Sequence, residues 1–488
     1  MTDLVAGLDI GTSGARAIVA DLHGDVVADA TAEYPLLTPR PGWTEQHPEE
    51  WWQASCHVLR MVARQAPGPI RALGLTGQMH GSVFLDAGAR VIRPALLWND
   101  QRTAEQCAWI TAQVGAERLI ALTGNPALTG FQAPKIIWLR DTEPEHFARV
   151  QSVLLPKDFV RLRLTGVLAT DASDAAGTLL LDARTRDWSA GILAALDLPA
   201  RWFPQVHEGP DVTGTLLPDV AADLGLPAGI PVVAGGGDNA AAAVGTGVIR
   251  PGIVSVSIGT SGVVFAHTDQ FAPDPSGRLH AFCHAVPGRY HLMGVTLAAG
   301  GALRWLRDVV APGVAYDLLV AEAERVPPGA DGLLFLPYLS GERTPHMDPD
   351  ARGAFAGLSL AHTRAHLTRA VLEGVAFSLR DALEIMRALG TPLEEIRAVG
   401  GGARSPLWRS ILATVVGAPL VRTVAEQGPA FGAAFLAAVG AGYFPDVAAA
   451  AAVVRLRDEI TAPDTAARER YIEQYARYRR LYPSIRTV

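Results

Sequence analysis

The sequence predicts an α/β protein with two similar lobes, each a mixed β-sheet flanked by helices, and a ligand cleft between them. At 488 residues the chain is longer than one ordinary domain. The run DIGTSG at residues 9–14 returns as SIGTSG at residues 257–262, each time between apolar, β-branched stretches. Helical and strand-like segments then alternate after each copy, which favours mixed α/β sheets.

The first half begins with segments that suit strands buried on both faces, because they are apolar without a clean alternation. We expect strands at residues 4–10, 15–21 and 26–34, with a turn at His23-Gly24-Asp25. A helix is predicted at residues 48–64, because proline suits a first helical turn. A further strand at 70–75 ends in the sequence TGQMHG.

The second half repeats this plan and defines a second domain. Strands are expected at residues 253–258, 263–267, 290–295 and 396–399, and helices at 300–309, 362–389 and 405–416. Glycines and a proline cluster near residues 245–252, so we divide the chain into domains 1–247 and 248–488. Residues 430–444 are too short for a membrane span and predict a buried helix. An amphipathic helix at 466–481 is expected to cross back to the first lobe.

Composition excludes several partners and compartments. The 42 basic and 49 acidic residues give a net charge of −7, and no basic block stands out. Nucleic acids and anionic membranes are therefore not expected partners. Three separated cysteines without a CxxC pair suit a reducing cytosol, so we expect a cytoplasmic protein. Only Lys135 and Lys157 are lysines, so an anion site must use amides, hydroxyls, arginine or a metal ion.

The two repeated turns are candidate phosphate sites. Tight turns of this kind present consecutive amide and hydroxyl groups to one point, which makes a nest for anions. Two facing nests would hold a polyphosphate between the lobes, although four shared letters also arise by chance in a glycine-rich chain. The nest residues are Gly11, Thr12, Ser13, Gly259, Thr260 and Ser261.

Several common enzyme signatures are missing from the sequence. It contains no P-loop GxxxxGK[ST], and two isolated lysines cannot supply the protein-kinase motifs. The repeated turns do not fit GxSxG, and the other glycine runs do not fit GxGxxG. These patterns argue against a P-loop ATPase, an α/β-hydrolase and a Rossmann dehydrogenase.

Asp238 and Asp9 are the strongest candidates for catalysis. Asp238 follows a buried apolar strand and three glycines, where a held carboxylate would serve as general base for a sugar hydroxyl. The alternative is that Asp238 caps the alanine helix that follows. Asp9 ends a buried strand, and Mg²⁺ would offset the cost of its charge. The alternative is that Asp9 caps its own glycine turn.

Two polar loops are candidates for substrate binding. Met79 and His80 lie between glycines, and the sequence Trp98-Asn99-Asp100 follows another apolar run. Methionine in such a place is more often a core residue, and a lone histidine is more often structural. The spacing of His280, Cys283 and His284 suggests a metal, but no second ligand pair is evident, and a structural role stays open.

The ordered motifs resemble the FGGY family of carbohydrate kinases over essentially the whole chain. They are DIGTSG, PGWTEQ, GQMHG, LLWND, LPKDF, SDAAGT, AGGGDNAA, SIGTSG, FLPYLSGERTPH, GGGAR and GPA. The Met-His and Trp-Asn-Asp loops are more similar to members that phosphorylate D-xylulose than to those acting on glycerol. The resemblance implies two ribonuclease-H-like lobes of the actin and hexokinase type, with sugar on the first and ATP on the second.

The resemblance also implies roles for individual residues. Asp238 would be the general base, and Asp9 would organise Mg²⁺ and the γ-phosphate, with both carboxylates near the metal. Met79, His80 and Asn239 match sugar-contacting positions, and Trp98, Asn99 and Asp100 are added to that set. Arg16 would help to neutralise the phosphates. Gly400, Gly401 and Gly402 would lie near the nucleotide. The double glycine at 300–301 is left without a contact.

Mg-ATP and a sugar are thus the expected ligands, and a homodimer is the oligomer that the resemblance implies. Three alternatives remain. One is an FGGY kinase for another ketose or polyol, such as ribulose, glycerol or gluconate. Another is a non-catalytic sensor of sugar and nucleotide, and the third is an actin-like or chaperone-like ATPase.

Overall fold

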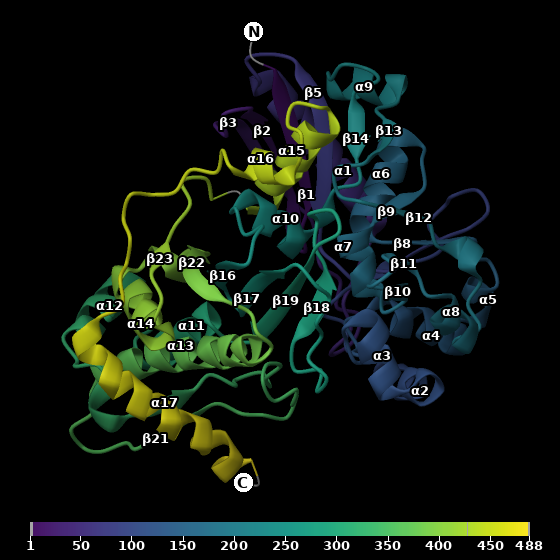
Figure 1. Cartoon of the computed structure of the whole chain (residues 1–488). Coiled ribbons are helices and arrows are strands. Elements are labelled where there is room, and N and C mark those ends of the chain that lie inside the picture. The colour runs from purple at the N-terminus through teal and green to yellow at the C-terminus, as the bar shows by residue number, and fades with distance from the viewer. Residues whose placement is uncertain (1–2, 427, 487–488) are drawn as a thin grey trace.

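The computed structural model describes residues 3–426 and 428–486, which form two lobes (Figure 1). The sheet of the first lobe has the strand order β13-β14-β5-β1-β2-β3, with β15 also paired to β5. Its strands are β1 (Leu4–Ile10), β2 (Gly14–Asp21), β3 (Val26–Glu33), β5 (Ile70–Gly77), β13 (Val212–Thr215), β14 (Pro231–Val233) and β15 (Gly236–Gly237).

The sheet of the second lobe has the order β18-β19-β17-β16-β22-β23. Its strands are β16 (Gly252–Ile258), β17 (Gly262–Thr268), β18 (His280–Cys283), β19 (Tyr290–Thr296), β22 (Leu393–Val399) and β23 (Leu420–Val421). The hairpin β16–β17 matches β1–β2, β19 matches β3, and the parallel neighbour β22 matches β5. The predicted α/β class with two similar mixed sheets is therefore confirmed.

The two repeated turns differ in register, although their sequences are the same. In the first hairpin Ile10 pairs with Ala15, and Gly11 N–H donates to Gly14 O at 3.0 Å. In the second, Ile258 pairs with Gly262, so this turn is one residue tighter. Residues at equivalent positions of the two turns therefore pair with non-equivalent residues across their hairpins.

Helices cover both faces of the first sheet. On one side α1 (Pro48–Gln65), α6 (Pro156–Thr165) and α9 (Pro218–Leu224) enclose an apolar core with the strands. The helix α1 begins with proline and two glutamates, which suit the positive end of the helix dipole. On the other side lie α10 (Asp238–Gly245), α15 (Gly428–Gly440) and α16 (Val447–Ala451).

The helix α15 belongs to the second half of the sequence but packs on the first sheet, against β1, β5 and α10 (Figure 1). Glycines permit this approach: a Cβ on Gly7 or Gly74 would lie 1.9 Å from a backbone oxygen of α15. The predicted buried helix is thus confirmed. Its position means that a division of the chain at residue 247/248 does not separate the two lobes in space.

The C-terminal helix α17 (Thr465–Ile485) stays on the second lobe, and the expectation that it crosses back is wrong (Figure 1). Its tyrosines face α13 (Arg364–Ala388), where Tyr475 donates to Asp381 at 2.6 Å and Tyr471 donates to Glu373 at 2.9 Å. The other helices of this lobe are α11 (Gly300–Val310), α12 (Tyr316–Glu324) and α14 (Pro406–Val416), with a small hairpin of β20 (Leu334–Leu336) and β21 (Ala354–Ala356).

A long insertion between β5 and β14 builds the outer part of the first lobe around its own core. It contacts the second lobe at β18, where His280 Nδ1 and Asn125 Oδ1 are 2.7 Å apart. Its helices are α2 (Ala104–Val114), α3 (Ala116–Thr123), α4 (Gln132–Thr142), α5 (Pro144–Phe147), α7 (Ala172–Ala175) and α8 (Ala190–Ala195). Short strands complete it: β6 (Val83–Leu85), β7 (Ala95–Leu96), β8 (Ser152–Leu154), β9 (Ala169–Asp171), β10 (Leu181–Asp182), β11 (Asp187–Trp188) and β12 (Gln205–His207), with β4 (Glu45–Gln46) paired to β7.

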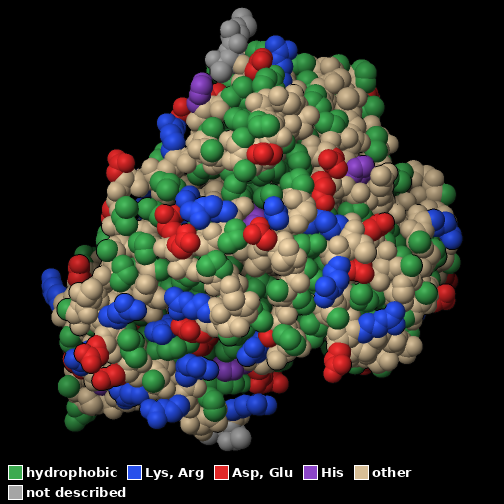
Figure 2. All heavy atoms as spheres, viewed as in Figure 1, with side chains coloured by type: hydrophobic (Ala, Val, Ile, Leu, Met, Phe, Trp, Pro, Cys, Tyr) green, Lys and Arg blue, Asp and Glu red, His purple; other side chains and the backbone are tan. Residues whose placement is uncertain are grey.

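Acidic and basic side chains are interspersed over the face shown in Figure 2. Among the described residues, no helix is both long enough and apolar enough to span a membrane.

Candidate functional site

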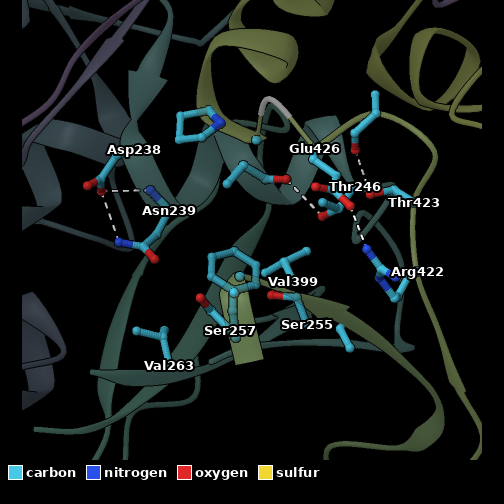
Figure 3. Close-up of a pocket in the computed structure, with 18 of the residues that line it drawn as sticks. Asp238, Asn239, Thr246, Ser255, Ser257, Val263, Val399, Arg422, Thr423 and Glu426 are labelled. Carbon is cyan, nitrogen blue, oxygen red and sulfur yellow. Dashed lines mark hydrogen bonds and ion pairs between the residues drawn. The ribbon is translucent and has the colours of Figure 1, made fainter. Parts of the chain in front are cut away.

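Three cavities share lining residues: two lie where the lobes meet, and the third lies within the second lobe. The central cavity, of about 550 Å³, takes its lining from both lobes, including Arg16 and Asp238 from the first and Ser257 from the second (Figure 3). The small cavity, of about 210 Å³, shares Asp238 and Asn239 with it. The apolar cavity, of about 730 Å³, shares Gly401 and Arg404 with the central one. Asp238 therefore stands between the central and small cavities, and Gly401 between the central and apolar ones.

The chain delivers Asp238 by a strand and a tight glycine run. After β14, Gly235 has a φ of +76°, and a Cβ there would lie 1.8 Å from Leu75 O, so only glycine fits. The helix α10 begins at Asp238, and the carboxylate accepts from the N–H and the Nδ2 of Asn239, at 2.7 and 2.9 Å (Figure 3). Burial raises the pKa of Asp238 to about 6, although the two hydrogen bonds oppose the shift.

Asp9 lies in β1, opposite Arg16 of β2. Its Oδ1 atom is buried and has no hydrogen-bond partner among the described residues. Burial, together with the charge of Asp238, raises the pKa of Asp9 to about 7, and the charge of Arg16 only partly opposes this. Arg16 itself donates to Asp29, so it does not satisfy the carboxylate.

These properties fit a divalent cation. Asp9 has an orphaned buried oxygen, and its pKa is raised by the neighbouring carboxylate of Asp238, so a bound divalent cation would stabilise the ionised site. Among residues 3–426 and 428–486 no cluster of three or more metal-ligating side chains exists. The donor set therefore suits Mg²⁺ bound largely through water and phosphate rather than a closed protein cage.

The small cavity gathers four of the predicted sugar-binding residues: Met79, His80, Trp98 and Asn239. His80 adopts a φ of +69° and its Nδ1 lies 2.5 Å from Gly177 O. Burial lowers the pKa of His80 to about 3, so the ring is neutral and its other nitrogen is free to face a ligand.

Asn99 and Asp100 do not line this cavity. Asn99 Oδ1 accepts from Thr44 Oγ1 at 2.8 Å. Asp100 is fully buried, accepts from Thr44 N–H at 2.7 Å and forms an ion pair with Arg102 at 2.7 Å. These contacts assign the carboxylate to holding the loop that carries Trp98, whose Nε1 donates to Thr12 Oγ1 at 2.9 Å.

The second repeated turn stands between the cavities. Gly259 and Thr260 line the apolar cavity, and Ser261 lines the small one. Gly400 and Gly401 line the central cavity, and Gly401 and Gly402 line the apolar one. The first turn, Gly11–Thr12–Ser13, lines none of these three cavities.

Gly300, which was left without a contact from sequence, lines the apolar cavity with Leu303, Arg304 and Trp408. Its N–H donates to Gly259 O at 2.7 Å, and a Cβ on Gly300 would lie 2.5 Å from that oxygen. The double glycine therefore allows α11 to begin directly against the second turn. The contact between Gly300 and the second repeated turn could not be deduced from the sequence, because 40 residues separate Gly300 from Thr260.

Both lysines of the chain are fully buried. Lys135 Nζ donates to His80 O at 2.8 Å and to Gly130 O at 2.5 Å, and burial lowers its pKa to about 7. Because His80 and Gly130 both line the small cavity, this ammonium group holds two segments of its wall together.

Lys157 lies in α6 among three buried carboxylates. Its Nζ is 2.6 Å from Asp158 Oδ1, 2.7 Å from Asp171 Oδ2 and 3.4 Å from Asp174 Oδ2. Burial lowers the pKa of Lys157, but the carboxylates outweigh it and the net pKa is raised. Asp171 Oδ1 accepts from Ser173 Oγ, which accepts in turn from Gly237 N–H at 3.1 Å, next to Asp238. This chain of contacts fixes the backbone that carries Asp238.

The His280, Cys283 and His284 group is held by protein contacts rather than arranged as a metal site. His284 Nε2 lies 3.1 Å from Val248 O, and Cys283 is a buried free thiol. His280 additionally lines the small cavity. Phe131 and Arg343 line the same cavity and were not singled out from sequence. Arg343 lies in the FLPYLSGERTPH motif, which was the available signal.

The chain matches the N-terminal domain model of the FGGY family of carbohydrate kinases over residues 4–245 and the C-terminal domain model over residues 254–441. It is 47% identical to the xylulose kinase of Escherichia coli strain K12, over 89% of this chain and 90% of the relative. It is 41% identical to that of Lactococcus lactis, over 98% and 96%. The crystal structure of a xyloylose kinase from Brucella ovis superposes with a TM-score of 0.94 at 42% identity, over 99% of each chain. The chain therefore belongs to the FGGY family of carbohydrate kinases.

Proposed function

We propose that the chain transfers the γ-phosphate of ATP to the C5 hydroxyl of D-xylulose. The observation that carries this proposal is the position of Asp238 and Asn239, which line both the small cavity and the central one. A sugar in the small cavity and a nucleotide reaching through the central cavity would meet at this carboxylate. The names of the relatives supply the identity of the sugar.

In this proposal the nucleoside lies in the apolar cavity, beside Gly401, Gly402 and Gly300. The phosphates pass the second repeated turn toward Asp238, where amide and hydroxyl groups would donate hydrogen bonds to the phosphate oxygens. Phosphoryl transfer depends mainly on alignment and neutralisation of charge. Asp9 and Asp238 would hold Mg²⁺, which supplies that neutralisation when bound.

Asp238 acts as the general base. With a pKa of about 6, most of its carboxylate is ionised at neutral pH, while it remains basic enough to take a proton from a hydroxyl. The proton passes from the sugar C5 hydroxyl to the Asp238 carboxylate. At the same time the sugar oxygen attacks the γ-phosphorus of ATP, and ADP leaves. Asn239, which donates twice to the carboxylate, keeps it oriented. Met79, His80 and Trp98 hold the sugar, and closure of the lobes excludes water as a competing acceptor.

A homodimer in the cytoplasm is the assembly and location that we propose with this activity: the dimer on the resemblance to the family, and the location on the three separated cysteines. Nucleic acids and membranes are not proposed as partners, because the charges are mixed in sign and no basic block exists in the sequence.

The test is sugar-dependent release of ADP, measured with a coupled assay across D-xylulose, L-ribulose, glycerol and gluconate. We expect D-xylulose to give the highest kcat/KM. The control is Asp238→Asn, which should bind ATP in calorimetry but lose roughly 10²–10⁴-fold in turnover. A much higher kcat/KM for another sugar would overturn the assignment of substrate, and hydrolysis of ATP without sugar would favour the ATPase alternative.

A further inference from the structure

Arg343 reaches the small cavity from the second lobe, opposite the sugar-binding residues of the first. Its backbone is held by the preceding residue: Glu342 accepts from Thr296 Oγ1 at 2.6 Å, from Leu297 N–H at 3.1 Å and from Arg343 N–H at 2.8 Å. The side chain therefore projects from a fixed point rather than from a free loop.

The guanidinium of Arg343 has no partner within the described parts of the chain. None of the side-chain hydrogen bonds or ion pairs involves it, and only its backbone N–H is engaged. Burial lowers the pKa of Arg343, against the opposing charge of Glu342. The side chain is only partly exposed, so its charge has lost part of its hydration, and a ligand oxygen in the cavity would offset that cost.

Within the small cavity, Arg343 lies near Gly130, His80 and His280. A Cβ placed on Gly130 would be 3.9 Å from Arg343 Nη2 and 2.6 Å from Trp98 O. The charge of Arg343 lowers the pKa of His80 and of His280, so it is near both rings. It does not contribute to the shift at Asp238. A sugar with its reacting hydroxyl at Asp238 therefore extends toward Arg343.

The chemistry of the substrate identifies which group reaches that end. A 2-ketopentose closes its furanose ring through the C5 oxygen, so that oxygen is free for phosphorylation only in the open-chain form. In the open chain C2 is a carbonyl, and the C1 hydroxyl lies beside it. These two oxygens are at the opposite end of the molecule from C5, and a guanidinium offers paired donors in one plane.

We propose that Arg343 recognises the keto end of the open-chain sugar, donating to the C2 carbonyl oxygen and the C1 hydroxyl oxygen. This inference rests on the proposed function and adds to it: the site selects ketoses over polyols through a residue of the second lobe. Because Asp238 and Arg343 lie on different lobes, a bound ketose also connects the two lobes directly.

The test compares D-xylulose with xylitol and D-arabinitol, the two pentitols formed by reducing its C2 carbonyl. We expect Arg343→Met to lower kcat/KM for D-xylulose by roughly 10- to 100-fold, as for loss of hydrogen bonds from a charged group. The ratio of kcat/KM for D-xylulose to that for each pentitol should fall by about tenfold or more. Where turnover of a pentitol is too slow, its Ki against D-xylulose replaces kcat/KM. Arg343→Lys, which keeps the charge but not the planar pair of donors, should be intermediate.

The matched control is Arg352→Met, which removes an exposed arginine of the same segment and should leave both kinetic constants and the melting temperature unchanged. Equal losses for ketose and pentitols in Arg343→Met, or no loss, would overturn the inference while leaving the proposed function intact. A wild-type protein that releases no ADP with D-xylulose would overturn the proposed function and the inference together.

Discussion

At the scale of single residues, Asp9 is a buried carboxylate whose ionisation lowers the stability of the folded protein. The pKa of Asp9 is raised by burial to about 7, so the folded protein binds a proton more tightly than the unfolded chain between about pH 4 and pH 7. The free energy of unfolding therefore falls as pH rises through this range. A cation bound at Asp9 would restore this free energy of unfolding, so the stability of the protein should depend on the ligands of the site.

Asp9→Asn should consequently stabilise the ligand-free protein at high pH. We expect the melting temperature in the presence of a metal chelator to rise by roughly 1–4 °C at pH 8. The gain should shrink toward pH 4, where the wild-type carboxyl is protonated in the folded protein and no longer carries a buried charge. Calorimetric scans over this pH range measure the effect, with the exposed Asp219→Asn as control. A gain that is the same at every pH would show that charge is not its cause.

A site residue could be predicted from sequence where the residues beside it in the chain also determine its environment. Asp238 and Asn239 follow a glycine run, and both line the central and small cavities. Asp100 looked equally suitable, yet its partner Arg102 removes it from the cavity, and sequence does not reveal which polar neighbour is bonded. Arg343 is the opposite case: its motif does not show that its guanidinium lines the small cavity without a protein partner among the described residues.

At the scale of elements, α15 illustrates what a linear sequence conceals. Its apolar, glycine-rich composition correctly predicted a buried helix, but not that the helix packs on the sheet of the other lobe. Close contact depends on three-dimensional matches such as Gly74 against Ala433 O, which no local pattern contains. A helix from the second half of the chain does pack on the first lobe, but that helix is α15 and not the final helix α17.

Gly74→Ala should separate α15 from β5. The added Cβ would lie 1.9 Å from Ala433 O, so the helix must move, and we expect a loss of about 1–3 kcal/mol in the free energy of unfolding. Since α15 supports α10, kinase activity should fall as well. Chemical denaturation and the coupled assay test this, with Gly88→Ala in an exposed turn as the matched control. A wild-type unfolding midpoint for Gly74→Ala would contradict the close packing described.

At the scale of the whole molecule, the chain crosses between lobes three times: from α10 to β16, from β23 to α15 and from α16 to α17. Gly247 and Gly428 lie at two of these crossings with positive φ values of +72° and +45°. The crossings provide a natural axis for rotation of one lobe against the other, and the central cavity lies between the parts that would move.

Closure should therefore require both ligands. We expect the radius of gyration from small-angle X-ray scattering to fall when D-xylulose and a non-hydrolysable ATP analogue are present together, and to change less with either alone. Arg343→Met should weaken the effect of sugar, because it removes a contact from the second lobe. Identical scattering profiles with and without both ligands would argue for a rigid cleft.

The burial of Lys135 and Lys157 has a consequence for the chemical reactivity of the protein. With both ammonium groups shielded, no lysine side chain is accessible to acetylation, ubiquitin transfer or amine-reactive reagents while the fold is intact. Lys135 becomes reactive only when the contacts with His80 and Gly130 in the wall of the small cavity open. Amine labelling of Lys135 is thus a direct report of opening at this cavity, whereas labelling of Lys157 reports opening of its cluster of carboxylates.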